Sequence, residues 1–126
     1  MLLENRYAPL TKEIVGCAMR VQTALGNGFP EIIYQRSLAV EFAHHGLPFE
    51  QELHLPVYYL NQEVGSRRVD FLVDKVVLVE LKALTEITAL HYAQVINYLK
   101  AYQLEVGLLL NFGEASLKYK RFLRSA

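Results

Sequence analysis

The sequence predicts an α/β protein with one mixed sheet, whose helices and strands follow one another in the order ααβββαββ. Two segments near the N-terminus and one around residue 95 carry apolar residues at helical spacing. Between them lie stretches that alternate apolar and polar residues, as half-buried strands do. A nearly continuous apolar run over residues 105–112 follows the last helical segment, which is typical of a strand covered on both faces.

Helices are expected over residues 11–25 and 30–45. Thr11 suits the N-cap of the first helix, and the glycine-containing segment 26–28 ends it. Pro30 suits the first turn of the second helix, which ends before Gly46. The expected core faces are Ile14, Ala18, Val21 and Leu25 in the first helix and Tyr34, Leu38 and Phe42 in the second.

Three strands are expected next, over residues 49–59, 66–73 and 76–81. Pro56 lies inside the first of them, which indicates an edge strand or a bulge. The short turn at Asp74 and Lys75 joins the second strand to the third. These three strands therefore form a meander of antiparallel hairpins.

A third helix is expected from Thr88, its N-cap, to about Tyr102. Its predicted core residues are Leu90, Ala93, Ile96 and Leu99. The strand over residues 105–112 follows this helical crossover and should pair parallel to an earlier strand. Residues 117–123 are predicted as a last strand rather than a short helix, because apolar and basic residues alternate there.

Composition predicts one folded domain over residues 1–126. The chain is 52% hydrophobic and 21% charged, which favours a packed globule over a disordered chain. Its apolar runs are too short to span a bilayer, and its first residues lack the features of a signal peptide. The single cysteine, Cys17, excludes an internal disulfide. We therefore expect a cytoplasmic protein with no membrane partner.

Charge is unevenly distributed, although the net charge is +0. Residues 1–63 carry a balance of −3, and residues 64–126 carry +3. Four cations lie within seven positions near the C-terminus: Lys118, Lys120, Arg121 and Arg124. Such a cluster is most often a solvated surface, with contact to a phosphate backbone as the less common alternative. The charge alone therefore decides little about a nucleic-acid partner.

Asp70, Glu80 and Lys82 interrupt strands that otherwise consist mainly of Val, Leu and Phe. Successive side chains of a strand point to opposite faces, so Glu80 and Lys82 share one face. Asp70 lies on the preceding strand and can sit beside Glu80 across the sheet. Carboxylates in an apolar sheet are costly to desolvate unless they bind something. The pattern therefore points to a divalent cation.

These residues resemble the signature of the PD-(D/E)XK nuclease superfamily, with Asp70 on the second core strand and Glu80-Leu81-Lys82 on the third. A second motif, Gly28, Glu31 and Tyr34, is similar to the G-x-x-E-x-x-Y pattern of the GxxExxY family, a small branch of that superfamily. Further residues that resemble the family are His91, Gln94, Asn97, Tyr98 and the segment 111–113. The similarity extends from about Leu10 to Phe122.

The resemblance implies a restriction-endonuclease-like core that holds Mg²⁺, with Mn²⁺ as an alternative. Asp70, Glu80 and the carbonyl of Leu81 would bind the ion, because magnesium prefers oxygen ligands. Glu31 would ligate a second metal or hold a metal-bound water. Such an ion neutralises charge at phosphorus and generates hydroxide from water, which phosphodiester hydrolysis requires.

Lys82 and Gln94 complete the implied catalytic set. Lys82 would orient or help deprotonate the attacking water and stabilise developing negative charge. Gln94 would position the nucleophile or a phosphate oxygen. His91, one turn before Gln94, is a further candidate for the same pocket.

Each of these residues also has a purely structural interpretation. Asp70 could pair with Arg68 or Lys75, and Glu80 could form a salt bridge with Lys82 on a solvated face. Glu31, Gln94 and Tyr98 also have structural explanations: the first would stabilise a helix dipole, and the other two could form a surface pair. Cys17 is expected to be a small core residue, since no Cys/His pairing in the sequence indicates a zinc site.

The predicted function is that of a metal-dependent nuclease, endo- or exonucleolytic, that hydrolyses phosphodiester bonds in DNA, with RNA as an alternative substrate. The competing prediction is a catalytically silent module of the same fold that binds nucleic acid or protein. A third interpretation is an enzyme for another phosphoester. Nucleic acid is the expected partner, and a homodimer or larger assembly is expected because many small nucleases of this fold act in that form.

Overall fold

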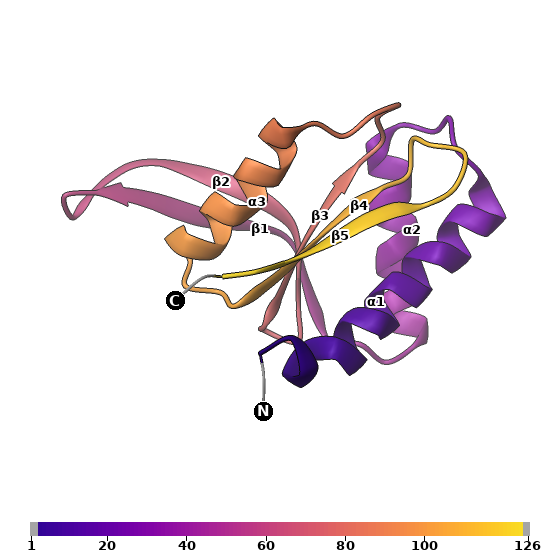
Figure 1. Ribbon diagram of the computed structural model, residues 1–126, viewed down its shortest axis with the longest axis horizontal. Helices are drawn as coiled ribbons and strands as arrows, with labels where there is room; N and C mark the ends of the chain where they lie inside the picture. The colour runs from indigo at the N-terminus through magenta and orange to yellow at the C-terminus, as the bar shows by residue number, and fades with distance from the viewer. Residues whose placement is uncertain (1–2, 125–126) are drawn as a thin grey trace.

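The computed structural model describes residues 3–124 and contains three helices and one sheet (Figure 1). The elements in chain order are α1 (Leu3–Leu25), α2 (Glu31–His44), β1 (Phe49–Tyr59), β2 (Gln62–Val73), β3 (Val77–Lys82), α3 (Ala89–Ala101), β4 (Val106–Asn111) and β5 (Lys118–Leu123). This arrangement confirms the predicted mixed fold and the order ααβββαββ.

The strands lie in the spatial order β1-β2-β3-β4-β5. All neighbours pair antiparallel except β3 and β4, which pair parallel through the α3 crossover. The predicted parallel pairing is therefore confirmed. β1 is an edge strand with a register shift between Val57 and Tyr58, as the proline at position 56 indicated.

Helices cover both faces of the sheet (Figure 1). α1 and α2 pack on one face, where a large apolar cluster includes Tyr34, Phe42 and Phe71. α3 packs on the other face over a smaller cluster that includes Leu78 and Leu109. The β1–β2 hairpin extends beyond the helices, so the base of this hairpin is where the sheet enters the layered part of the molecule.

The first helix begins earlier than its sequence predicts. α1 starts at Leu3, and Thr11, the expected N-cap, lies inside it with its hydroxyl donating to the carbonyl oxygen of Ala8 at 3.2 Å. The helix continues through Pro9 because tertiary contacts hold its first turns. The hydroxyl of Tyr7 donates to the carboxylate of Glu105 at 2.8 Å.

The buried face of α3 also differs from the prediction. Leu99 is buried, as predicted, and so is Val95, which the prediction did not include. The other three predicted core residues are exposed: Leu90, Ala93 and Ile96. The reason is Gly107 on β4, where a Cβ atom would lie 3.0 Å from the Val95 side chain. This glycine lets α3 approach the sheet along Val95 and Leu99. Leu90 and Ile96 then lie on the side of the helix that faces away from the sheet.

The second helix and the central strands follow their predictions closely. Tyr34, Leu38 and Phe42 are completely buried, and every residue of β4 is buried. Within residues 3–124 no helix is both long and apolar enough to cross a membrane.

Candidate active site

The candidate site lies where β2 and β3 separate. Their antiparallel pairing runs from Val73 opposite Val77 to Phe71 opposite Val79 and stops there. One step further, the register would place Asp70 opposite Glu80. Beyond this point carboxylate side chains, not backbone carbonyls, accept the hydrogen bonds between the two strands. The two predicted acids therefore lie side by side where the strands separate.

Two hydrogen bonds from backbone amides hold these acids. The backbone amide of Leu81 donates to Oδ2 of Asp70 at 2.8 Å, and the backbone amide of Asp70 donates to Oε1 of Glu80 at 3.2 Å. Each carboxylate therefore occupies the place of a ladder partner on the opposite strand. Both side chains are partly buried, so neither is freely solvated.

α2 approaches the same acids from the other side. Nε2 of Gln35 donates to Oδ1 of Asp70 at 2.8 Å, and Nε2 of Gln51 on β1 donates to Oε1 of Gln35 at 3.1 Å. Gln35 is only 5% exposed. This Gln51–Gln35–Asp70 chain orients the Asp70 carboxylate. Glu31 lies one turn before Gln35 on the same helix face and is more exposed.

The G-x-x-E-x-x-Y segment has a clear local role. Gly28 has φ of +111°, a conformation that favours glycine. The Tyr34 hydroxyl donates to the carbonyl oxygen of Gly26 at 2.6 Å and accepts from the amide of Phe29 at 3.3 Å. The Tyr34 ring stacks on Phe112 with centroids 4.7 Å apart. The tyrosine thus anchors the loop from which Glu31 begins α2.

Burial dominates the electrostatics of the acids. The pKa of Glu80 is raised from its ordinary 4.5 to about 8, mainly by burial and then by the charge of Asp70. Burial also raises the pKa of Asp70, against the lowering effect of the hydrogen bonds from Leu81 and Gln35. For Glu31, loss of water contact and then the Asp70 charge raise the pKa, while Lys82 lowers it.

These shifts are the test of whether the residues fit a metal ion. The raised pKa values show that the positive charge near these carboxylates does not offset their desolvation. Lys82 is the cation that lowers the pKa of all three acids, and burial outweighs its effect. A hard divalent cation with oxygen ligands would supply that charge. The donor set of carboxylates and strand carbonyls therefore fits Mg²⁺ or Mn²⁺.

The oxygens of Glu31, Asp70 and Glu80 do not all lie within 4.8 Å of one another. Within the described part of the chain, Cys17, Glu41 and His45 form a group that meets this distance. Like charges repel, so carboxylates without a bound cation are expected to stand apart. Cys17 is completely buried, as predicted, but the packing of α1 on α2 also brings it close to His45, a pairing that the sequence did not indicate.

Lys82 and Gln94 lie on the α3 side of the sheet. Lys82 follows Glu80 by two residues on β3, shares its face and is partly buried. Burial and then the charge of Glu80 raise the pKa of Tyr98, which places this part of α3 within electrostatic reach of the acids. Gln94 is one turn before Tyr98 and partly buried, and it has no hydrogen bond to the acids in the described structure.

His91 is used by α3 itself. Its Nδ1 accepts a hydrogen bond from the backbone amide of Thr88 at 3.0 Å and thereby caps the helix. The ring is therefore committed to the helix N-terminus, and a place in the pocket is not supported. Thr88 is the N-cap, as predicted.

Two residues of the site, Gln35 and Gln51, escaped the sequence analysis. A signal existed for Gln35, which lies four residues after Glu31 and therefore on the same helix face. Gln51 occupies an alternate position of β1, and the strand pattern alone does not distinguish it from its polar neighbours. Their roles follow from the packing of α2 across the base of the β1–β2 hairpin.

Comparison with known proteins shows the family of this chain. A family model described as the PD-(D/E)XK nuclease superfamily matches residues 8–122, so the chain belongs to that superfamily. Nucleases of this superfamily generally depend on a divalent metal, and the family suggests a nucleic-acid substrate.

A solved structure described as "Crystal structure of SSO0001" has a similar fold. The two chains are 17% identical with a TM-score of 0.58, over 98% of this chain and 62% of that one. The chain thus spans less than two thirds of that protein, and at this identity the likeness concerns the fold alone. The fold is consistent with a restriction-endonuclease-like core. Comparison with curated proteins gave no match.

Proposed function

We propose that this protein is a metal-dependent nuclease of the GxxExxY branch that hydrolyses phosphodiester bonds in DNA, with RNA as the alternative substrate. The observation that carries the proposal is the pair Asp70 and Glu80 at the separation of β2 and β3, with Lys82 on the same face as Glu80. Burial raises the pKa of both acids, which favours a bound cation as their partner.

Asp70, Glu80, Glu31 and the carbonyl of Leu81 would hold Mg²⁺ or Mn²⁺. The amide of Leu81 points to the β2 side, where it donates to Asp70. In a strand the amide and carbonyl of one residue point to the same neighbour, so the Leu81 carbonyl also faces the opening left by β2. The ion would neutralise phosphate charge and lower the pKa of a bound water.

Lys82 and Gln94 have roles beside these ligands. The Lys82 ammonium would orient the attacking water, accept or share its proton, and stabilise negative charge on the phosphate. Gln94 would hold the water or a phosphate oxygen from α3. Gln35 would keep the Asp70 carboxylate in place through its 2.8 Å hydrogen bond.

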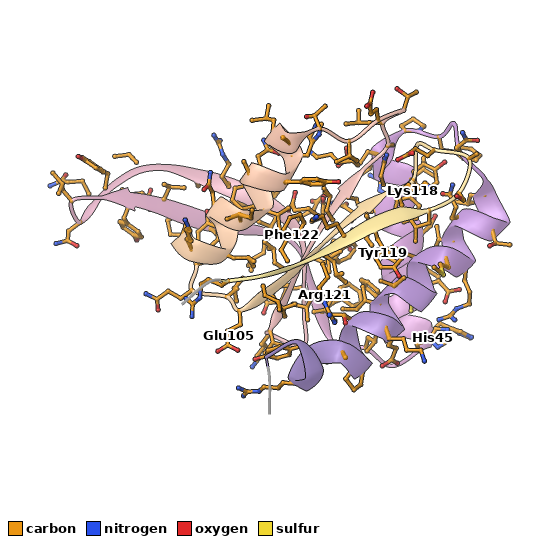
Figure 2. All side chains as sticks on the ribbon, in the orientation of Figure 1. His45, Glu105, Lys118, Tyr119, Arg121 and Phe122 are labelled. Carbon is orange, nitrogen blue, oxygen red and sulfur yellow. The ribbon has the colours of Figure 1, made fainter. Side chains whose placement is uncertain are left out.

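The C-terminal strand supports a polyanionic substrate. Lys120 pairs with Leu109, which pairs with Glu80, and Lys118 pairs with Asn111. Paired residues share a face, so both lysines lie on the face of the acids, about 10 Å away across two strand spacings. Figure 2 shows Lys118 at the end of β5 that lies toward the N-terminal end of α2. Cations at this distance suit the phosphates flanking a scissile bond.

The GxxExxY assignment is supported by the division of roles within its motif. Gly28 takes the left-handed conformation and Tyr34 anchors the loop. The charge of Asp70 raises the pKa of Glu31, so these two acids are within electrostatic reach of each other. A silent binding module of the same fold is the second candidate. It is favoured by the wider spacing of the three acids, whose oxygens do not all meet within 4.8 Å. We further propose a cytoplasmic location, a single domain and self-association.

The test is a substrate panel with Mg²⁺ or Mn²⁺ and plasmid, linear, branched and single-stranded DNA, together with RNA. Cleavage of at least one substrate is expected, and Lys82→Ala should abolish it while the fold persists. Lys100→Ala is the matched control, because this lysine is exposed in the last turn of α3. Cleavage that survives Lys82→Ala would contradict the proposed site, and binding without cleavage would favour the silent module.

A further inference from the structure

A second cluster of metal-binding side chains lies at the far end of α2. Cys17 on α1 and Glu41 and His45 at the C-terminal end of α2 each offer a ligand atom, and these atoms lie within 4.8 Å of one another. Cys17 is completely buried, Glu41 is partly buried and His45 is exposed. The cluster therefore spans the α1–α2 interface from the core to the surface.

Helix geometry explains why these side chains meet. Glu41 and His45 are four residues apart on one face, and Nε2 of His45 lies 3.0 Å from Oε2 of Glu41. Cys17 presents its thiol to this face from α1, which packs beside α2. Figure 2 shows His45 beside α1 at the end of α2 opposite Glu31. Along the helix, residues 31 and 45 are separated by about 21 Å.

The cluster already attracts positive charge. Arg20 donates from Nε to Glu41 at 3.2 Å and from Nη2 to the Cys17 sulfur at 3.3 Å. Its side chain is 48% exposed. Arg20 can therefore move into solvent without breaking the core, and the thiol and carboxylate that it contacts would then be free for another cation.

We propose that Cys17, Glu41 and His45 form a binding site for Zn²⁺, separate from the acids at the other end of α2. Thiolate sulfur, imidazole nitrogen and carboxylate oxygen are the three ligand types that zinc takes in proteins. Ligands on tetrahedral zinc stand about 3.5 Å apart, so side-chain rotations of about an ångström bring this cluster into place. Three protein ligands leave one position for water.

Binding exchanges one cation for another. Zn²⁺ displaces the Nη2 contact of Arg20, the Cys17 thiol gives its proton to solvent, and the neutral His45 ring binds through a nitrogen lone pair. The carboxylate of Glu41 has a second oxygen, so it can bind the ion and keep its ion pair with the Nε of Arg20. The ion then links α1 to α2 and resists their separation on unfolding.

The direct test is titration of metal-free, reduced protein with Zn²⁺ by calorimetry and with Co²⁺ by absorbance. Millimolar Mg²⁺ is present throughout, and the titration is repeated in Asp70→Asn, so that the acids of the other site do not contribute. We expect one Zn²⁺ per chain, a rise in the unfolding temperature, and a sulfur-to-cobalt charge-transfer band. Each result should persist in Asp70→Asn.

Variants separate ligands from neighbours. His45→Gln should weaken Zn²⁺ binding at least about tenfold, and Cys17→Ser should remove the charge-transfer band. His44→Gln is the matched control, an adjacent histidine in the last turn of α2 outside the cluster, and should leave affinity unchanged. His45 is exposed, so its variant remains informative if Cys17→Ser fails to fold. A folded protein without the thiolate band, or equal affinity in His45→Gln, would overturn the proposal.

Discussion

One end of α2 holds a single acid, Glu41, and the other end holds three acids, and the two ends differ in how these charges are neutralised. At the C-terminal end Glu41 contacts Arg20 at 3.2 Å and His45 at 3.0 Å, so its charge has partners within the protein. At the N-terminal end the acids share hydrogen bonds from neutral amides, and burial raises the pKa of Asp70 and Glu80.

This difference separates an acid that stabilises the fold from one that is available for chemistry. A carboxylate with a cationic partner contributes to stability, whereas a desolvated carboxylate without one costs stability until a ligand arrives. The strand separation at Asp70 and Glu80 creates the second condition, because it removes the ladder partners. Lys82 is the lysine whose charge lowers the pKa of both acids, and burial outweighs it.

The largest effect is expected when one acid at each end of α2 is neutralised. Glu80→Gln retains the oxygen that accepts from the Asp70 amide, yet we expect cleavage to fall by roughly a thousandfold, equal to about 4 kcal/mol of lost transition-state stabilisation. Glu41→Gln should leave cleavage unchanged. Steady-state cleavage rates of both variants under saturating metal provide the measurement, and equal losses in the two would refute the distinction.

The pH dependence of stability should also distinguish the desolvated Glu80 from an acid with a cationic partner. The folded-state pKa of Glu80 is about 8 against an ordinary 4.5, so its contribution to stability is fully present below about pH 4.5 and is lost as the pH rises through 8. Without metal, wild type should therefore lose roughly 4 kcal/mol of unfolding free energy relative to Glu80→Gln as the pH rises from 5 to 9.

Urea denaturation in EDTA at these pH values measures that difference. Added Mg²⁺ should restore wild-type stability at high pH and leave Glu80→Gln almost unchanged, because the ion binds only the ionised acid. A wild-type protein that gains stability relative to the variant as the pH rises would show that Glu80 is not desolvated.

A smaller effect is expected from the glutamine chain behind Asp70. Gln35→Leu removes the 2.8 Å hydrogen bond to the carboxylate and should weaken Mn²⁺ binding about tenfold to a hundredfold. Gln51→Leu should have a weaker effect in the same direction, since it acts through Gln35. Calorimetric titration of the two variants with Mn²⁺ ranks their affinities. A larger loss of affinity in Gln51→Leu than in Gln35→Leu would contradict the proposed hydrogen-bond chain from Gln51 through Gln35 to Asp70.

The smallest effect concerns the loop that carries Glu31. Tyr34→Phe keeps the ring on Phe112 but loses the hydroxyl contacts to Gly26 and Phe29, at a cost of about 1 kcal/mol in unfolding free energy. Tyr119→Phe on the exposed edge strand is the control and should cost almost nothing. Thermal unfolding with matched buffers compares them, and equal stabilities would show that the hydroxyl does not hold the loop.

Strand positions and the central pair of acids could be predicted from the sequence because both depend on local spacing. Alternation fixed the face shared by Glu80 and Lys82, and the short turn at Asp74 brought Asp70 next to Glu80. The face of α2 was equally clear, since its apolar residues stand at one helical spacing.

Features that depend on tertiary contacts could not be predicted. The start of α1 is set by Tyr7 bonding to Glu105, which is 98 residues away in the chain. The buried face of α3 is chosen by Gly107 on another strand. Gln35 became part of the site only through its burial against Asp70, and Cys17 meets His45 only because two helices pack together.

The metal site at Asp70 and Glu80 is tested most directly by a crystal structure of the protein grown with Mn²⁺, examined for anomalous scattering. We expect one strong peak at the separation of β2 and β3, about 2.1 Å from oxygens of Asp70, Glu80 and the Leu81 carbonyl. Glu80→Gln crystals should lack it. Crystals with saturating Mn²⁺ and no peak within coordination distance of Asp70 and Glu80 would contradict the proposed metal site.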